Sequence, residues 1–109
     1  MKYEIRAFEL ANGKVPFEEW LDGLRDLSAK ARVLTAVSKM SVGNFGWAKS
    51  LKGVPEVFEY RIDSGPGYRI YYRLSGRKIV LLWGGTKRTQ TRDIDRARTL
   101  TRLLDKEKP

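Results

Sequence analysis

The residues best suited to chemistry are basic and lie in three separate segments. Arg61 stands in VFEYRI, Arg69 in GPGYRIYY, and Lys87 and Arg88 in GGTKRTQTRD, where Gln90 adds an uncharged polar group. The planar fork of an arginine matches phosphate oxygens better than most other ligands. These residue types therefore predict a site for a phosphate-bearing molecule, provided that the fold brings the three segments together.

The first two segments are expected to meet in a β-hairpin. Residues 57–62 and 68–74 alternate with a period of two, and DSGPG between them is a turn sequence. This hairpin pairs Ile62 with Tyr68 and sets Arg61 directly across from Arg69. Like charges that face each other are unfavourable, and a slip of one residue would turn an apolar face outward.

Such a pair of arginines needs a negative charge. One interpretation is that the site accepts an anion, for which phosphate is the best match. The alternative is that Glu59 or Asp63 neutralises the pair within an ordinary solvated face.

The third segment is expected to arrive at the same end of the sheet. KIVLLW, residues 78–83, is apolar on both faces and predicts a central strand. With Ser75-Gly76 as a two-residue turn, the expected pairs are Tyr72 with Ile79, Ile70 with Leu81, and Tyr68 with Trp83. The chain leaving Trp83 then emerges beside Arg69, and its two glycines allow a ligand to approach the backbone closely.

The net charge of the protein indicates which kind of ligand to expect. Lys and Arg number 22 against 13 Asp and Glu, which gives a net charge of +9. A basic surface attracts polyanions, so RNA or DNA is the expected partner. The alternatives are that the charge only keeps the protein soluble, or that an acidic partner neutralises it.

Cleavage of RNA without a metal needs a proton acceptor for the 2′-OH, charge stabilisation at the phosphate and a proton donor for the leaving oxygen. Arg61 and Arg69 suit the charge role, and Lys87 is the best candidate for proton transfer. Tyr71, on the same strand face as Arg69, is a candidate to stack a base or assist proton transfer. With no histidine, no cysteine and no carboxylate cluster at ligand spacing, we expect no metal and no cofactor.

The elements that position these residues are those of a single α+β domain spanning residues 1–109, with residues 105–109 as a frayed tail. We expect a strand at about residues 3–8, a helix from Pro16, a second helix capped by Ser28 and ended by Gly43, and a closing helix capped by Thr89 or Thr91. The first two helices should form a hairpin, and Trp20 should belong to the core. The closing helix presents an arginine face: Arg92, Arg96, Arg98 and Arg102.

The location of the protein is expected to be cytoplasmic. The start, MKYEIRAFEL, has no apolar signal core, and no apolar run approaches the roughly 18 residues of a membrane span. The absence of cysteine agrees with a reducing compartment.

Four segments together resemble the RelE/ParE toxin superfamily, in particular its HigB-like branch of phage-derived addiction-module killer proteins. They are PFEEWLDGL, the NFG after the second helix, GPGYRIYY, and LLWGGTKRTQTRDIDRA. The resemblance spans roughly residues 1–104. It implies a RelE-like fold, with an N-terminal strand and a helical hairpin packed on a mainly antiparallel sheet and a C-terminal helix.

The resemblance also implies a function, that of a type II toxin that cleaves mRNA, often on the ribosome. A cognate antitoxin, commonly a helix-turn-helix DNA-binding protein, would neutralise it. By position, Arg69 matches the family's strand arginine near the scissile phosphate. Arg61 matches a basic strand residue, and Lys87 and Arg88 match the basic stretch after the last strand. Further phosphate contacts are expected from Gln90, Arg73 and Arg92.

Two departures from the family pattern leave the general acid and base open. The chain has no histidine, and Ile94 stands where some members have a catalytic tyrosine. Two alternatives therefore remain: a ParE-like poison of DNA gyrase, which acts by binding a protein, and a non-catalytic RNA-binding relic.

Overall fold

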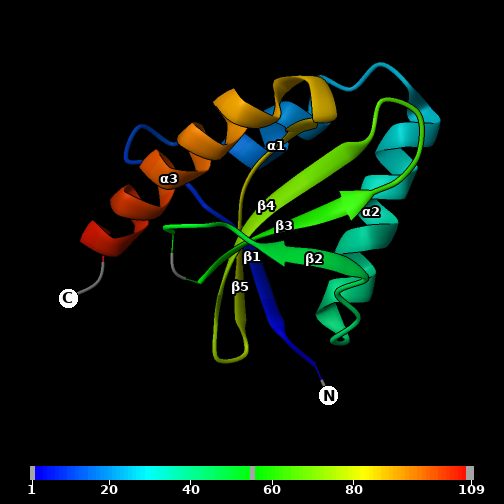
Figure 1. Ribbon diagram of the computed structural model, residues 1–109. Coiled ribbons are helices and arrows are strands. Elements are labelled where there is room, and N and C mark those ends of the chain that lie inside the picture. Colours follow the sequence, from blue (N-terminus) through cyan, green and yellow to red (C-terminus); the bar gives the residue numbers. More distant parts are fainter. Residues whose placement is uncertain (1, 55, 108–109) are drawn as a thin grey trace.

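The fold is a five-stranded sheet with three helices in the computed structural model, which describes residues 2–54 and 56–107 (Figure 1). The strands are β1 (Glu4–Ala7), β2 (Trp47–Ser50), β3 (Val57–Ile62), β4 (Tyr68–Ser75) and β5 (Lys78–Thr86). Their order in the sheet is β1-β5-β4-β3-β2. β1 pairs with β5 in parallel, and the pairs of β5 with β4, β4 with β3 and β3 with β2 are antiparallel.

The helices cover both faces of the sheet. On one face, α1 (Pro16–Asp22) and α2 (Leu27–Ser41) bury Phe17, Val33 and Met40 against β3, β4 and β5. On the other face, α3 (Gln90–Glu107) buries Ala97, Leu100 and Leu104, whose spacing places them on one side of the helix. The two apolar clusters confirm the predicted α+β arrangement, with consecutive N-terminal helices on one side and the C-terminal helix on the other.

The start of α2 differs from the prediction. Its N-cap is Asp26, not Ser28, since Asp26 Oδ1 accepts hydrogen bonds from the backbone N–H groups of Ser28 at 2.9 Å and Ala29 at 3.3 Å. An aspartate at this position satisfies helix N–H groups as well as a serine does. The helix ends at Ser41, and Gly43 has a φ of 85°, which favours the glycine expected there.

One edge strand of the sheet, β2, was not predicted from the sequence. β2 pairs with β3 and forms an edge of the sheet (Figure 1). All four of its residues are exposed, so its sequence shows no alternation of apolar and polar residues and gives no strand signal.

The hairpin of β4 and β5 has a different register from the predicted one. Ser75 pairs with Lys78, so the two-residue turn is Gly76-Arg77 rather than Ser75-Gly76. Gly76 has a φ of 60°, which fits the first central position of a type II′ turn. Tyr72 consequently faces Leu81 instead of Ile79. The shift of two residues leaves Tyr72, Ile79 and Leu81 on their predicted common face. Trp83 does not keep its predicted face, because it pairs with Tyr71 rather than with Tyr68.

A β-bulge between Tyr71 and Tyr72 shifts the register once more. Tyr71 faces Trp83, and Leu82 is the extra residue on β5. Beyond the bulge, Ile70 pairs with Gly84 and Arg69 with Gly85, so β5 continues through both glycines to Thr86. The glycine pair, expected to be a loop, is therefore part of the strand.

Candidate functional site

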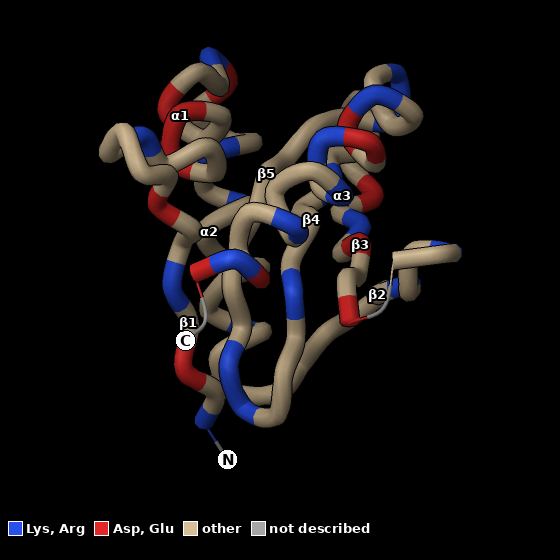
Figure 2. The backbone as a smooth tube through the Cα atoms, turned by 90° about the vertical axis from the view of Figure 1, so that its left-hand side faces the viewer, with Lys and Arg blue, Asp and Glu red and all other residues tan. Residues whose placement is uncertain are grey.

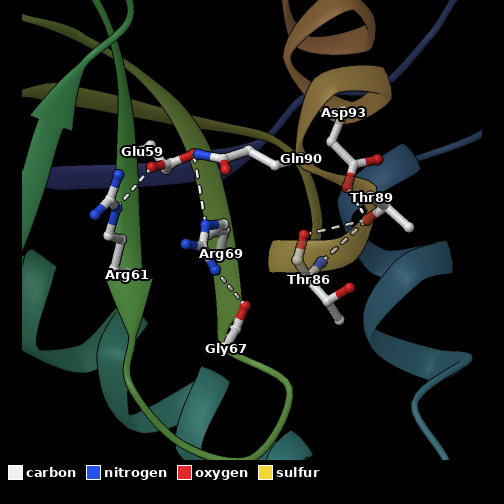
Figure 3. Close-up of polar contacts among 8 residues, drawn as sticks. All are labelled: Glu59, Arg61, Gly67, Arg69, Thr86, Thr89, Gln90 and Asp93. Atoms are coloured by element: carbon white, nitrogen blue, oxygen red, sulfur yellow. Dashed lines mark hydrogen bonds and ion pairs between the residues drawn. The ribbon is translucent and has the colours of Figure 1, made fainter.

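The predicted arginine pair is present at the end of β3 and β4. Arg61 is the register partner of Arg69. Between them lies Glu59, with Oε1 at 2.9 Å from Nε of Arg61 and Oε2 at 3.7 Å from Nε of Arg69 (Figure 3). The Glu59 side chain is 1% exposed and that of Arg69 is 8% exposed, whereas Arg61 is 40% exposed. Of the two sequence interpretations, neutralisation by Glu59 is observed, but on a buried rather than a solvated face.

Gln90, the first residue of α3, completes the surroundings of Glu59. Its Nε2 donates a hydrogen bond to Glu59 Oε2 at 2.7 Å (Figure 3). Both carboxylate oxygens are thus engaged, one by Arg61 and the other by Gln90 and Arg69. In this arrangement Glu59 holds charged side chains in place and is closed to a substrate.

The carbonyl oxygen of Gly67 links the second segment to the third. It accepts a hydrogen bond from Arg69 Nη1 at 2.6 Å and another from the backbone N–H of Lys87 at 2.9 Å. The predicted approach of GGTKRTQTRD to the GPGYR turn is therefore confirmed. Because Lys87 makes this contact through its backbone, its side chain remains exposed, as does that of Arg88.

A second buried network holds the basic turn in place. Lys87–Thr89 form a 3-10 turn directly before α3. Asp93, which is 3% exposed, accepts a hydrogen bond from Trp83 Nε1 at 3.0 Å. It also accepts a hydrogen bond from the hydroxyl of Thr89 (Figure 3). The Thr89 hydroxyl also accepts from the backbone N–H of Thr86 at 3.2 Å. No role for Asp93 is predicted from the sequence, because its partners Trp83 and Thr89 are brought to it only by the fold.

Two glycines allow these networks to pack closely. A Cβ at Gly84 would overlap the indole ring of Trp20, and a Cβ at Gly85 would overlap the carboxylate of Asp93. The glycines were expected to let a ligand approach the backbone. Instead, side chains of the protein itself occupy that space, and Trp20 is part of the core as predicted.

Tyr71 is not available for the role predicted for it. Its side chain is fully buried in the cluster under α3, so its ring offers no surface to an RNA base. The Tyr71 hydroxyl has no hydrogen-bond partner among the described residues. Burial raises the pKa of this hydroxyl above its ordinary value, and the negative charges of Glu59 and Asp93 raise the pKa further. The prediction of base stacking by Tyr71 was therefore wrong.

Arg73 is also engaged elsewhere. It lies four residues beyond Arg69 on β4, and its guanidinium binds Glu56 at 3.2 Å and also contacts Asp105 of α3. Its side chain is 11% exposed. These contacts fasten α3 to the sheet and leave little of Arg73 for a phosphate. Arg92, in the first turn of α3, is exposed.

Several charged side chains surround an open groove next to the site. The groove, about 480 Å³ in volume, lies between α2 and the end of β3, and its lining includes Arg32, Lys39, Arg61 and Asp63.

Figure 2 shows that Lys and Arg residues occur on helices and strands alike, mixed with acidic residues. Within residues 2–54 and 56–107 there is no group of three side chains suited to hold a metal ion.

None of the helices in the described part of the chain combines the length and the apolar character that a membrane span requires.

Comparison with known proteins supports the fold and places the chain in a family. No protein-family model matches the sequence. A mutant of the Escherichia coli toxin RelE in the free state superposes with a TM-score of 0.59 and 17% sequence identity, over 88% of this chain and 98% of that chain. The toxin–antitoxin complex RelBE2 from Mycobacterium tuberculosis gives 0.49 and 21% identity, over 80% and 100%. The first of these structures shows a RelE-like fold.

A sequence relative is much closer. An uncharacterized protein of Haemophilus influenzae is 42% identical over 89 residues, which are 81% of this chain and 88% of that protein. At this identity and coverage, the chain belongs to the same family as the Haemophilus influenzae protein.

Proposed function

We propose that this protein is the toxin of a type II toxin–antitoxin system, of the HigB-like branch, and that it cleaves mRNA without a metal ion. It acts in the cytoplasm on ribosome-bound mRNA, and a helix-turn-helix antitoxin neutralises it. The observation that carries the proposal is the convergence of Arg61, Arg69 and Lys87 from three segments at one end of the sheet. The RelE-like fold supports it.

The roles follow from exposure and contacts. Arg61, which is 40% exposed, stabilises the charge that develops on the scissile phosphate. Arg69, whose buried side chain contacts Glu59 and the carbonyl of Gly67, adds positive charge beneath the site. Lys87, with its exposed amine, takes the proton from the attacking 2′-OH and delivers it to the 5′-oxygen as that oxygen leaves. The exposed Arg88 and Arg92 bind neighbouring phosphates, whereas Gln90 acts by holding Glu59. Attack by the 2′-oxygen leaves a 2′,3′-cyclic phosphate and releases the 5′-oxygen.

One observation favours a second candidate function, that of a gyrase poison. The only carboxylate that contacts the arginine pair within the described residues is buried and fully engaged, and the chain has no histidine. A toxin that only binds a protein needs neither an acid nor a base.

The experiment that separates these functions is brief induction in bacterial cells, followed by mapping of new mRNA 5′ ends and of DNA breaks. The nuclease predicts new ends within coding regions for the wild type and their loss in Arg61→Ala and Arg69→Ala. Because Arg69 is buried beside Glu59, its variant needs a matching thermal melt. Growth arrest with intact mRNA and broken DNA indicates gyrase poisoning. Absence of arrest indicates a non-catalytic protein.

A further inference from the structure

Trp47 is much more exposed to solvent than a tryptophan side chain usually is. It begins β2 and is 81% exposed. The other two tryptophans have partners: Trp20 packs beside Gly84, and Trp83 donates a hydrogen bond to Asp93 while Arg96 lies over its ring at 4.6 Å. In the described residues, no other aromatic ring stacks on Trp47. A tryptophan normally buries a large apolar surface, and the exposed ring of Trp47 leaves that surface open to a ligand.

The strand register puts Trp47 beside the arginine pair. Trp47 pairs with Arg61, Arg61 pairs with Arg69, and Arg69 pairs with Gly85. Directly opposed residues of antiparallel strands project from the same face, with Cα atoms about 4.5–5.5 Å apart. The side chain of Trp47 therefore projects from β2, the strand next to Arg61, on the same face of the sheet as the proposed phosphate site.

The neighbouring charges favour a nucleic acid over a protein segment. Lys49 follows two residues after Trp47 and projects from the same face, and it is exposed. An aromatic ring beside basic side chains is the usual platform for single-stranded nucleic acid, in which bases stack on the ring while cations hold the backbone. The protein carries a net charge of +9, which agrees with such a ligand.

We propose that Trp47 is a base-stacking residue, which holds the base of a nucleotide next to the phosphate bound at Arg61. This inference rests on the proposed function, because it assumes that the ligand is single-stranded RNA. It assigns to β2 the role that the fully buried Tyr71 does not fill. Trp47 binds and orients the RNA and takes no part in proton transfer.

The test is equilibrium binding of a short, uncleavable 2′-O-methyl RNA oligonucleotide to the wild type, Trp47→Phe and Trp47→Ala. Loss of the ring in Trp47→Ala should weaken binding about 5- to 100-fold, and the phenyl ring of Trp47→Phe should restore most of it. Leu27→Ala is the matched control, since Leu27 is 77% exposed but lies at the start of α2. Its affinity should equal that of the wild type.

Salt dependence separates stacking from charge. We compare the slope of log association constant against log salt concentration between about 50 and 200 mM salt. Trp47→Ala should keep the wild-type slope, whereas Arg61→Ala should make the slope less steep by about 0.7. A merely structural role for Trp47 would change melting temperature and slope together, which contradicts the proposal.

Three other results would overturn the inference. Equal RNA affinity of the wild type and Trp47→Ala, in a wild type that cleaves RNA, removes the stacking role and leaves the proposed function intact. Unchanged RNA affinity with altered self-association or antitoxin binding makes Trp47 part of a protein interface. A wild type that neither binds nor cleaves RNA contradicts the proposed function, and the stacking role with it.

Discussion

Arg61 and Arg69 lie directly opposite each other in the antiparallel pair of β3 and β4, and the carboxylate of Glu59 contacts both side chains. Glu59 precedes Arg61 by two residues and so projects from the same face of β3. The anion that this pair needs is thus supplied by the chain. Glu59 contacts Arg61 through Nε, and the Arg61 side chain is 40% exposed.

The first prediction concerns this buried carboxylate. Glu59→Gln should lower the free energy of unfolding by about 3 kcal/mol, because it leaves Arg69 buried without its charged partner. The contact with Arg61 contributes less, since Arg61 is 40% exposed and water screens its charge. Urea unfolding followed by circular dichroism measures the change.

Asp95→Asn is the control for the loss of an acidic charge. Asp95 pairs with Arg98 on the outer surface of α3, where the two side chains are 71% and 36% exposed. The expected loss there is below about 0.5 kcal/mol. If Glu59→Gln proved no more harmful than this control, the buried ion pair would not be a stabilising feature.

The second prediction concerns alkaline pH. Burial raises the pKa of Tyr71 above its ordinary value of 10.0, and Glu59 and Asp93 raise the pKa further. Above about pH 10 the unfolded chain releases this proton while the folded protein keeps it, so the unfolded state binds fewer protons and stability falls as pH rises. In Tyr71→Phe, the free energy of unfolding should fall less steeply above about pH 10, by about 1.4 kcal/mol per pH unit.

The same variant has an expected effect at neutral pH. The Tyr71 hydroxyl is buried without a hydrogen-bond partner within the described residues, so its removal should leave stability unchanged or raise it by about 1 kcal/mol. RNA cleavage should also be retained, because the ring is fully buried. Thermal unfolding at neutral and alkaline pH tests the first two effects. A large loss of cleavage would restore Tyr71 as a participant in proton transfer.

The third prediction concerns the glycine pair of β5. Gly84→Ala should destabilise the fold by about 1–3 kcal/mol, since the added methyl group would overlap the ring of Trp20. Gly23→Ala is the matched control, because a Cβ there would meet only backbone oxygens at 3.4 and 3.5 Å. Unfolding midpoints of the two variants give the comparison. Equal midpoints would show that Trp20 has room to move.

Much of the fold could be predicted from the alternation of residues. The pairing of Arg61 with Arg69 followed from the position of DSGPG. The register of the next hairpin did not follow, because Ser75-Gly76 and Gly76-Arg77 both read as two-residue turns. The bulge opposite Tyr71 has no local signal at all. β2 was missed because an edge strand with no buried residue has no periodicity.

The candidate site could be predicted only as a set of positions. The approach of Lys87 to Arg69 followed from topology. The burial of Tyr71 did not, because sequence alternation shows which residues share a face but not which part of the face α3 covers. The central position of Glu59 depends on Gln90, which is 31 residues away in the sequence.

The last prediction concerns the proposed proton transfer. Lys87→Ala should lower the rate of RNA cleavage by about 100-fold or more, with an unchanged melting temperature. The structural contact of Lys87 is the hydrogen bond from its backbone N–H to Gly67, which truncation of the side chain leaves in place. Single-turnover cleavage of a short RNA measures the rate.

Two further variants separate proton transfer from charge. Lys14→Ala removes the same charge from an exposed loop position, and should cleave at nearly the wild-type rate. Lys87→Arg keeps the positive charge but replaces the amine with a group that hardly releases its proton. Cleavage by Lys87→Arg should therefore remain as slow as that of Lys87→Ala. Full activity of Lys87→Arg would instead show that Lys87 acts through its charge, and the transferred proton would then have to move through solvent.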